Sequence, residues 1–213
     1  MLHHHCITEL ISSIDNNVLI LEVACGTGHI TKLVSDMGRY IIACDLTPEM
    51  MEQAEKAVAT NNNVSFIRAN AFALPFGSNK IDVIISTRFL HLFPFDMQKQ
   101  ILTEFYRVLR PGGELIVDFD NFYQRWFYAV PYLLYNLAKY RRIAPDTHYN
   151  RFGQVKKALG SLGFKLRRSQ GVGGWHLMLL SVFFTKYAYN VGISQDRGFL
   201  FFLSEQFVIM AEK

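Results

Sequence analysis

The chain has 213 residues, half of them hydrophobic, which is enough for one well-formed core, and we expect residues 1–213 to form a single domain. The net charge of +4 is small for this length and no run of five basic residues occurs, so the composition does not favour a nucleic-acid partner. The three cysteines include no C-x-x-C pair, which indicates neither a disulfide framework nor a zinc site, and we expect a cytoplasmic protein without a metal.

The N-terminal segment, MLHHHCITELISSI, lacks the basic region and long apolar core of a secretory signal. Its consecutive residues His3, His4 and His5 could bind a metal, but residues near a chain end are commonly disordered. We therefore expect a disordered terminus and assign these histidines no role.

Short apolar runs separated by helical segments predict an α/β fold. Continuous rather than alternating hydrophobicity indicates strands buried on both faces, as in a parallel sheet covered by helices. The predicted strands are residues 18–23, 40–44, 64–67, 81–86, 114–119, 164–168 and 207–213.

The helices between these strands are placed by their end signals. Residues 28–37 form the first, and the second, over 48–58, has proline in its first turn. Asp96 resembles an N-cap before an apolar stripe that stops at Pro111, and a later helix ends at Gly163.

The first strand ends in LEVACGTG, which brings a carboxylate and a glycine turn to one place. Ligands of doubly wound sheets bind outside the carboxyl ends of the strands, where glycines let the backbone approach the ligand. A dinucleotide fingerprint needs a third glycine where Thr31 stands, and Glu22 would repel a pyrophosphate. Asp45, after the second strand, can accept both hydroxyls of an adenosine ribose. These residues favour a nucleoside that carries a cationic amino-acid tail.

With these residues the sequence resembles the class I S-adenosylmethionine-dependent methyltransferases, in particular the ubiquinone and menaquinone biosynthesis branch. The resemblance implies a Rossmann-like, doubly wound, mostly parallel seven-stranded sheet with an antiparallel last strand, in which residues 1–119 form the cofactor-binding core. Five motifs carry it in order: LEVACGTG (21–28), ACD (43–45), NAFALPF (70–76), IDVIISTRFLHLFP (81–94) and RVLRPGGELIV (107–117).

The resemblance also implies the cofactor, S-adenosyl-L-methionine, and the residues that hold its methionine, ribose and adenine parts. Alanine at position 24 replaces the usual glycine, which we expect to tighten the backbone only slightly. Asparagine at position 70 replaces the usual aspartate, so its hydrogen bond to adenine lacks charge assistance. The implied cofactor-binding residues are Glu22, Ala24, Cys25, Gly26, Thr27, Gly28, Asp45, Leu46, Met50, Asn70, Ala71, Ser86 and Thr87.

Methyl transfer requires mainly alignment of the reacting atoms and exclusion of water, and a base is needed only when the acceptor does not lose its proton readily. His91 is the candidate base by position, with a packed or turn-capping histidine as the alternative; His148 and His176 are weaker candidates. The loop after the fourth strand lacks the Asn/Asp-Pro-Pro-aromatic sequence of enzymes that methylate nucleobase amines, which again disfavours nucleic acid.

Two aromatic-rich insertions, over 120–150 and 173–203, separate the core from the last strands, and the first is predicted to be a helix kinked at Pro131. Because few residues precede the first strand, we expect these insertions to replace an N-terminal lid and to line a hydrophobic acceptor pocket. Alternatively they extend the core, dock on a membrane surface without spanning it, or form a homodimer interface.

The sequence therefore predicts a methyltransferase that acts on a small or lipid-like apolar acceptor, at oxygen, carbon or nitrogen. The alternative is a non-catalytic adenosylmethionine-binding or interaction module. The location that follows is cytoplasmic, with peripheral membrane contact left open.

Overall fold

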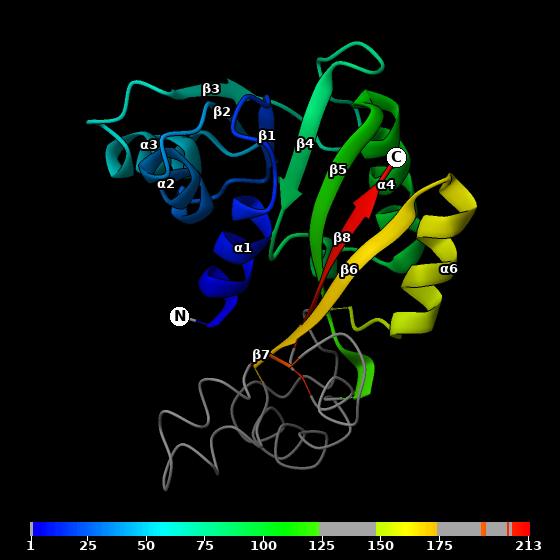
Figure 1. Ribbon diagram of the computed structural model, residues 1–213. Helices are drawn as coiled ribbons and strands as arrows, with labels where there is room; N and C mark the ends of the chain where they lie inside the picture. The colour runs from blue at the N-terminus through cyan, green and yellow to red at the C-terminus, as the bar shows by residue number, and fades with distance from the viewer. Residues whose placement is uncertain (1, 124–147, 174–192, 195–203, 205) are drawn as a thin grey trace, which may run out of the picture.

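The computed structural model describes residues 2–123, 148–173, 193–194, 204 and 206–213. These residues form one sheet of eight strands in the order β3-β2-β1-β4-β5-β8-β6-β7 (Figure 1). Its strands are β1 (Ile20–Val23), β2 (Ile41–Asp45), β3 (Val64–Arg68), β4 (Ile81–Ser86), β5 (Leu109–Asp120), β6 (Lys165–Val172), β7 (Ile193–Ser194) and β8 (Gln206–Glu212).

The predicted topology is confirmed. The first five strands of the chain pair in parallel, whereas β8 lies between β5 and β6 and is antiparallel to both. Seven strands match the predicted runs, and β7 is a two-residue addition beside β6. All of β1 and nearly all of β4 are buried, which explains why most of their residues are apolar.

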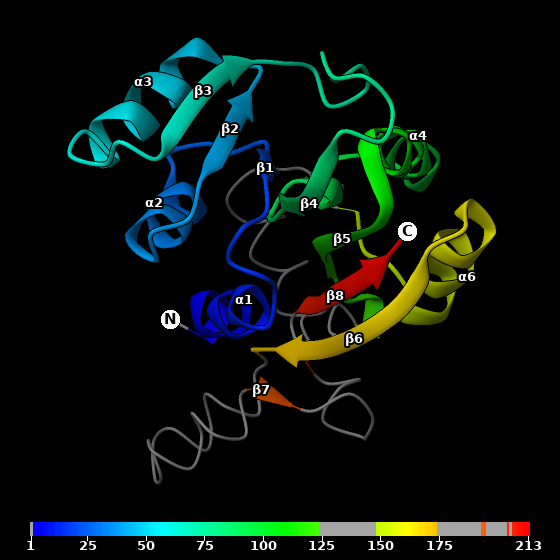
Figure 2. The same ribbon diagram turned by 45° about the horizontal axis from the view of Figure 1, so that its top comes forward.

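Helices cover both faces of the sheet (Figure 2). Side chains of α1 and α2, among them Ile7 and Val34, pack in one hydrophobic cluster, and those of α4 and α6, among them Phe105 and Leu159, pack in another on the opposite face. The described helices are α1 (Leu2–Ser12), α2 (His29–Asp36), α3 (Pro48–Ala57), the 3₁₀ helix η1 (Leu90–Leu92), α4 (Phe95–Val108) and α6 (Phe152–Leu162).

Two predicted helix ends are confirmed and one is wrong. Helix α3 begins at Pro48 after an N-cap threonine, and α6 ends at Gly163. Helix α4, however, begins at Phe95 with Pro94 in the N-cap position, so Asp96 lies inside the first turn. There its carboxylate pairs with Lys99 at 2.7 Å instead of capping the helix.

The prediction of a disordered N-terminus is also wrong, because residues 2–12 form α1. Cys6, Ile7, Leu10 and Ile11 lie on one side of this helix and are buried against the sheet and α2. Their spacing is that of an amphipathic helix, and this burial offsets the fraying expected near a chain end.

The aromatic insertions fall mainly on residues 124–147, 174–192 and 195–203, which lie outside the described residues, as do Pro131 and His176. Their roles therefore stay predictions. Among the helices that the structure describes, none combines the length and apolar character needed to cross a membrane.

Candidate functional site

Two hollows lie side by side at the carboxyl ends of β1, β2 and β4, and both are lined by Ala24, Gly26 and Arg88. The β2-side hollow has a volume of about 480 Å³, and the α1-side hollow about 460 Å³. The remaining lining of the β2-side hollow is Val23, Asp45, Leu46, Thr47, Met50, Ala69, Asn70, Ala71, Phe72, Phe89, Leu92 and Phe93. That of the α1-side hollow is His3, His4, Glu22, Cys25, Thr27, His29, Ile30 and Thr87.

The turn between β1 and α2 forms the wall between the two hollows. Ala24 has a φ of 62°, in the left-handed region that disfavours a side chain, so its strain is larger than the slight tightening expected from the sequence. Gly28 also has a positive φ, of 80°, and a Cβ there would lie 2.8 Å from Ala54 of α3. This glycine is thus required for close packing of α2 on α3.

Glu22 lies at the base of the α1-side hollow and is 3% exposed. Its Oε2 accepts a 2.5 Å hydrogen bond from the hydroxyl of Thr31. Burial raises the pKa of Glu22 from 4.5 to about 8, and the bond from Thr31 opposes that rise. Thr31, which stands where a dinucleotide fingerprint would have its third glycine, therefore holds the Glu22 carboxylate in place. The sequence alone did not reveal this role.

Asp45 joins the β2 end to the glycine turn. One carboxylate oxygen accepts the N–H of Gly26 and the other that of Thr47, both at 2.9 Å. A carboxylate has about four acceptor positions, so two remain for a ligand. The aspartate is thereby oriented beside the β2-side hollow, where the sequence predicted a ribose-binding residue.

Apolar side chains border the same hollow on the side away from the turn. Leu46 and Met50 are 55% and 40% exposed, and both line the hollow in which the sequence predicted them to contact a face of adenine. Asn70 and Ala71 lie there too, and the Asn70 carboxamide oxygen accepts the N–H of Phe72 at 3.0 Å. Phe72 and Phe93, which meet edge to face at 5.5 Å, are lining residues absent from the sequence prediction.

The end of β4 separates buried from accessible residues. Ser86 is fully buried, lies outside the lining of both hollows, and has no hydrogen-bond partner for its hydroxyl among the described residues. Thr87 lines the α1-side hollow, and Arg88, exposed with a φ of 53°, lines both. Asp118 of β5 fixes this strained residue by accepting its N–H at 2.7 Å.

The candidate base His91 lies outside the lining of both hollows, unlike most of the predicted cofactor-binding residues. His91 lies in η1, half-buried and apart from the lining of both hollows, and its carbonyl accepts the N–H of His148 at 2.7 Å. Its role as a base stays a prediction. Cys25 lines the α1-side hollow, but burial raises its thiol pKa well above the usual range, so the thiol stays protonated and is a poor nucleophile.

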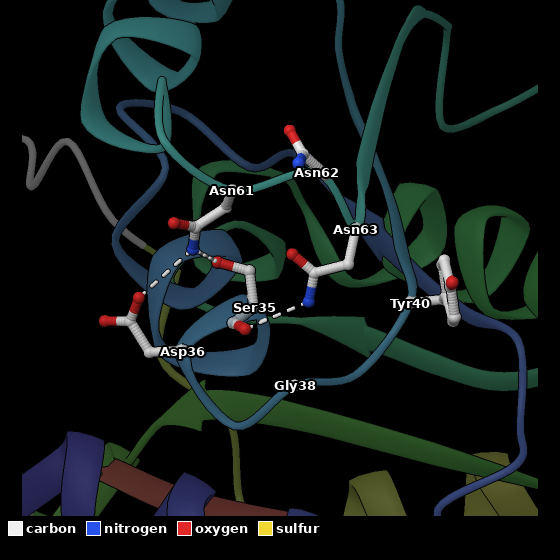
Figure 3. A pocket seen from close by; sticks show the side chains of 7 residues that line it. All are labelled: Ser35, Asp36, Gly38, Tyr40, Asn61, Asn62 and Asn63. Carbon is white, nitrogen blue, oxygen red and sulfur yellow. Dashed lines mark hydrogen bonds between the residues drawn. The ribbon is translucent and has the colours of Figure 1, made fainter.

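A third hollow, of about 520 Å³, lies at the opposite edge of the sheet, before β2 and β3 (Figure 3). Its carboxamides already bind within the protein: Asn61 donates to the hydroxyl of Ser35, and Asn63 donates to the carbonyls of Ser35 and Arg39. Because ligands of doubly wound sheets bind at the carboxyl ends, the two joined hollows are the candidate site.

The family assignment agrees with this geometry. Residues 21–117 match a family model described as a methyltransferase domain. They form a class I, S-adenosylmethionine-dependent methyltransferase domain. Over 113 residues, the chain is 34% identical to the ubiquinone/menaquinone biosynthesis C-methyltransferase UbiE of Enterobacter sp. (strain 638), a match that covers 50% of this chain and 44% of that protein. The chain thus spans less than half the length of the curated relatives it matches.

Solved structures share the fold of this methyltransferase domain and of the strands that follow it. A SAM-dependent methyltransferase from Methanosarcina mazei superposes with a TM-score of 0.69 at 18% identity, over 96% of each chain. Magnesium protoporphyrin IX methyltransferase (ChlM) from Synechocystis PCC 6803, solved with bound SAH, gives a TM-score of 0.70 at 14% identity, over 99% of this chain and 82% of that one.

The residues of the two hollows fit S-adenosylmethionine. Asp45 offers unused acceptor positions to ribose hydroxyls, Leu46 and Met50 offer apolar surface to adenine, and Glu22 offers a carboxylate to an ammonium group. When bound, the cofactor supplies an electrophilic methyl group on a sulfonium. The methyltransferase domain itself contributes binding, orientation and the exclusion of water.

Proposed function

We propose that the protein transfers a methyl group from S-adenosylmethionine to a small or lipid-like apolar acceptor. The observation that carries this proposal is the pair of joined hollows, with Asp45 in one and Glu22 in the other. In a ligand with a nucleoside at one end and an amino acid at the other, the nucleoside would lie beside Asp45 and the amino acid beside Glu22.

The apolar character of the acceptor is supported by where the insertions leave the sheet. Strand β5 ends at Asp120 and β6 at Val172, and both run antiparallel to β8, so their carboxyl ends lie at the same edge as the hollows. The aromatic insertions follow directly in sequence, and eight aromatic residues occur between Asn121 and Arg142.

The ends of the insertions are held together at that edge by hydrogen bonds. The N–H of Asn150 donates to the carbonyl of Asp120 at 2.8 Å, and the carboxamide of Asn121 donates to the carbonyl of Ser204 at 3.0 Å. Gln206 donates to the Asp120 carboxylate at 2.9 Å. These bonds hold the described residues that flank both aromatic segments together at the β5 end.

Binding of S-adenosylhomocysteine by calorimetry tests the cofactor part, and absence of binding at millimolar ligand would refute it. Methyl transfer from labelled S-adenosylmethionine is then measured with acceptors that share one head group and carry short or long alkyl chains. The proposal predicts a lower KM for the long chains. Equal KM values would refute an apolar acceptor site, and cofactor binding without transfer to any acceptor or cell extract would indicate the non-catalytic module.

A further inference from the structure

The first turn of α1 brings a histidine to a buried carboxylate at the edge of the site. His3 lines the α1-side hollow, and its Nε2 lies 2.8 Å from Oδ2 of Asp118. Asp118 is 1% exposed, and its other oxygen accepts the N–H of Arg88, the residue shared by both hollows. The histidine is therefore oriented by a fixed group that is itself tied to the β4 end.

Contacts further along α1 hold this arrangement in place. Four apolar side chains of the helix are buried in the cluster shared with α2 and the sheet, and Glu9 pairs with Arg168 of β6 at 2.5 Å. The position of His3 is thus set by the packing of a whole helix, which distinguishes it from a side chain on an unattached terminus.

The contact to Asp118 also determines which nitrogen of His3 can act as a base. A carboxylate accepts hydrogen bonds, so it favours the tautomer that carries hydrogen on Nε2. Nδ1 is then the nitrogen with a free lone pair. A histidine oriented in this way by an aspartate can accept a proton and keep the resulting imidazolium beside a negative charge.

We propose that His3 is the general base of methyl transfer, that Asp118 is its positioning residue, and that the accepting group is a hydroxyl of the phenol type. This inference rests on the proposed function, to which it adds the chemistry of the acceptor. Neutral amines attack through a lone pair and thiols ionise near neutral pH, whereas a phenol, with a pKa near 10, needs a base.

The proton and electron balance of this step is complete without a further reactant. The acceptor O–H bond breaks and its proton moves to Nδ1 of His3, while the electron pair left on the acceptor forms the bond to the methyl group. The bond between that methyl group and the sulfonium sulfur breaks, and its electron pair stays on sulfur.

The test compares His3→Ala and Asp118→Asn with His5→Ala, an exposed histidine on the same helix. Asparagine keeps an oxygen to accept the Arg88 N–H, but it removes the charge and turns a donor NH2 group toward His3, so the tautomer with hydrogen on Nε2 is no longer favoured. With an alkyl-substituted phenol as probe, we expect His3→Ala to lower kcat about a hundredfold to ten-thousandfold. Added imidazole should restore part of that loss, and S-adenosylhomocysteine affinity should change less than about twofold in all three variants.

A second readout needs no turnover. A chromophoric alkyl nitrophenol, bound in the presence of S-adenosylhomocysteine, should be more ionised in the wild-type protein and His5→Ala than in His3→Ala. Unchanged kcat and unchanged ionisation in His3→Ala, or transfer to amine probes only, would overturn the base assignment while leaving the apolar acceptor intact. Equal KM for short and long phenols would refute the apolar acceptor without touching the role of His3.

Discussion

The burial of Glu22 predicts that cofactor binding depends on pH with a sign that can be worked out in advance. Its pKa is about 8 in the folded protein, so below that pH the carboxyl group is protonated and neutral. A ligand ammonium binds the ionised form, which makes proton release part of binding. At pH 6 about one molecule in a hundred carries the ionised group, against about one in two at pH 8, so affinity for S-adenosylhomocysteine should be about fiftyfold lower at pH 6 than at pH 8.

The raised pKa of Glu22 also makes the free energy of unfolding depend on pH, and this quantity falls with rising pH whereas ligand affinity increases. The folded state holds the proton more tightly than the unfolded chain, so the free energy of unfolding without ligand should fall as pH rises from about 4.5 to about 8. Calorimetric titrations and urea denaturation across this window measure both slopes.

Replacement of Glu22 by glutamine separates the charge from the hydrogen bond. The carboxamide still accepts from Thr31, so we expect Glu22→Gln to flatten both pH dependences and to weaken binding at pH 8 by about tenfold or more. Glu55→Gln, on the exposed side of α3, should retain both slopes. Wild-type affinity that is flat between pH 6 and 8, or an unchanged slope in Glu22→Gln, would refute this reasoning.

Asp45→Ala removes two charge-assisted hydrogen bonds to the ligand, each worth about 1.5 to 3 kcal/mol, so S-adenosylhomocysteine affinity should fall at least about tenfold by calorimetry; unchanged affinity would contradict the ribose assignment. Ala24→Gly relieves the left-handed strain and should raise the free energy of unfolding in urea by about 0.5 to 1 kcal/mol, and a decrease would count against that strain. Gly28→Ala should destabilise by about 1 to 3 kcal/mol more than Gly38→Ala, because both positions have a positive φ but only the first meets Ala54; equal losses would exclude the packing role.

The strand order and most helix positions could be predicted because each depends on a local pattern that tertiary contacts reinforce. The mostly apolar run over residues 81–86 forms β4 with the predicted bounds, since burial on both faces favours apolar side chains at most positions of the strand. The Asp96 error has a local cause. An aspartate serves equally well as an N-cap or in the first helical turn, and Pro94 takes the cap position here.

The rest of the site depends on contacts between residues of different helices and strands. His3 meets Asp118 across 115 positions, and the partners come together only after α1 packs on the sheet. Thr31 reaches Glu22 because α2 folds back over β1. A sequence pattern reveals the periodicity of a single helix or strand. Each of these two contacts joins different elements, so the pattern could not predict it.

The backbone bridge between Asn121 and Asn150 lets the segment between them vary without moving its two ends. Both asparagines are buried, and their backbone bridge fixes the spacing of the two ends at the rim of the sheet whatever lies between them. Closing a loop twice as long between fixed ends costs only about 0.6 kcal/mol more. The segment between the two asparagines can therefore change in length while the sheet and the two hollows keep their geometry.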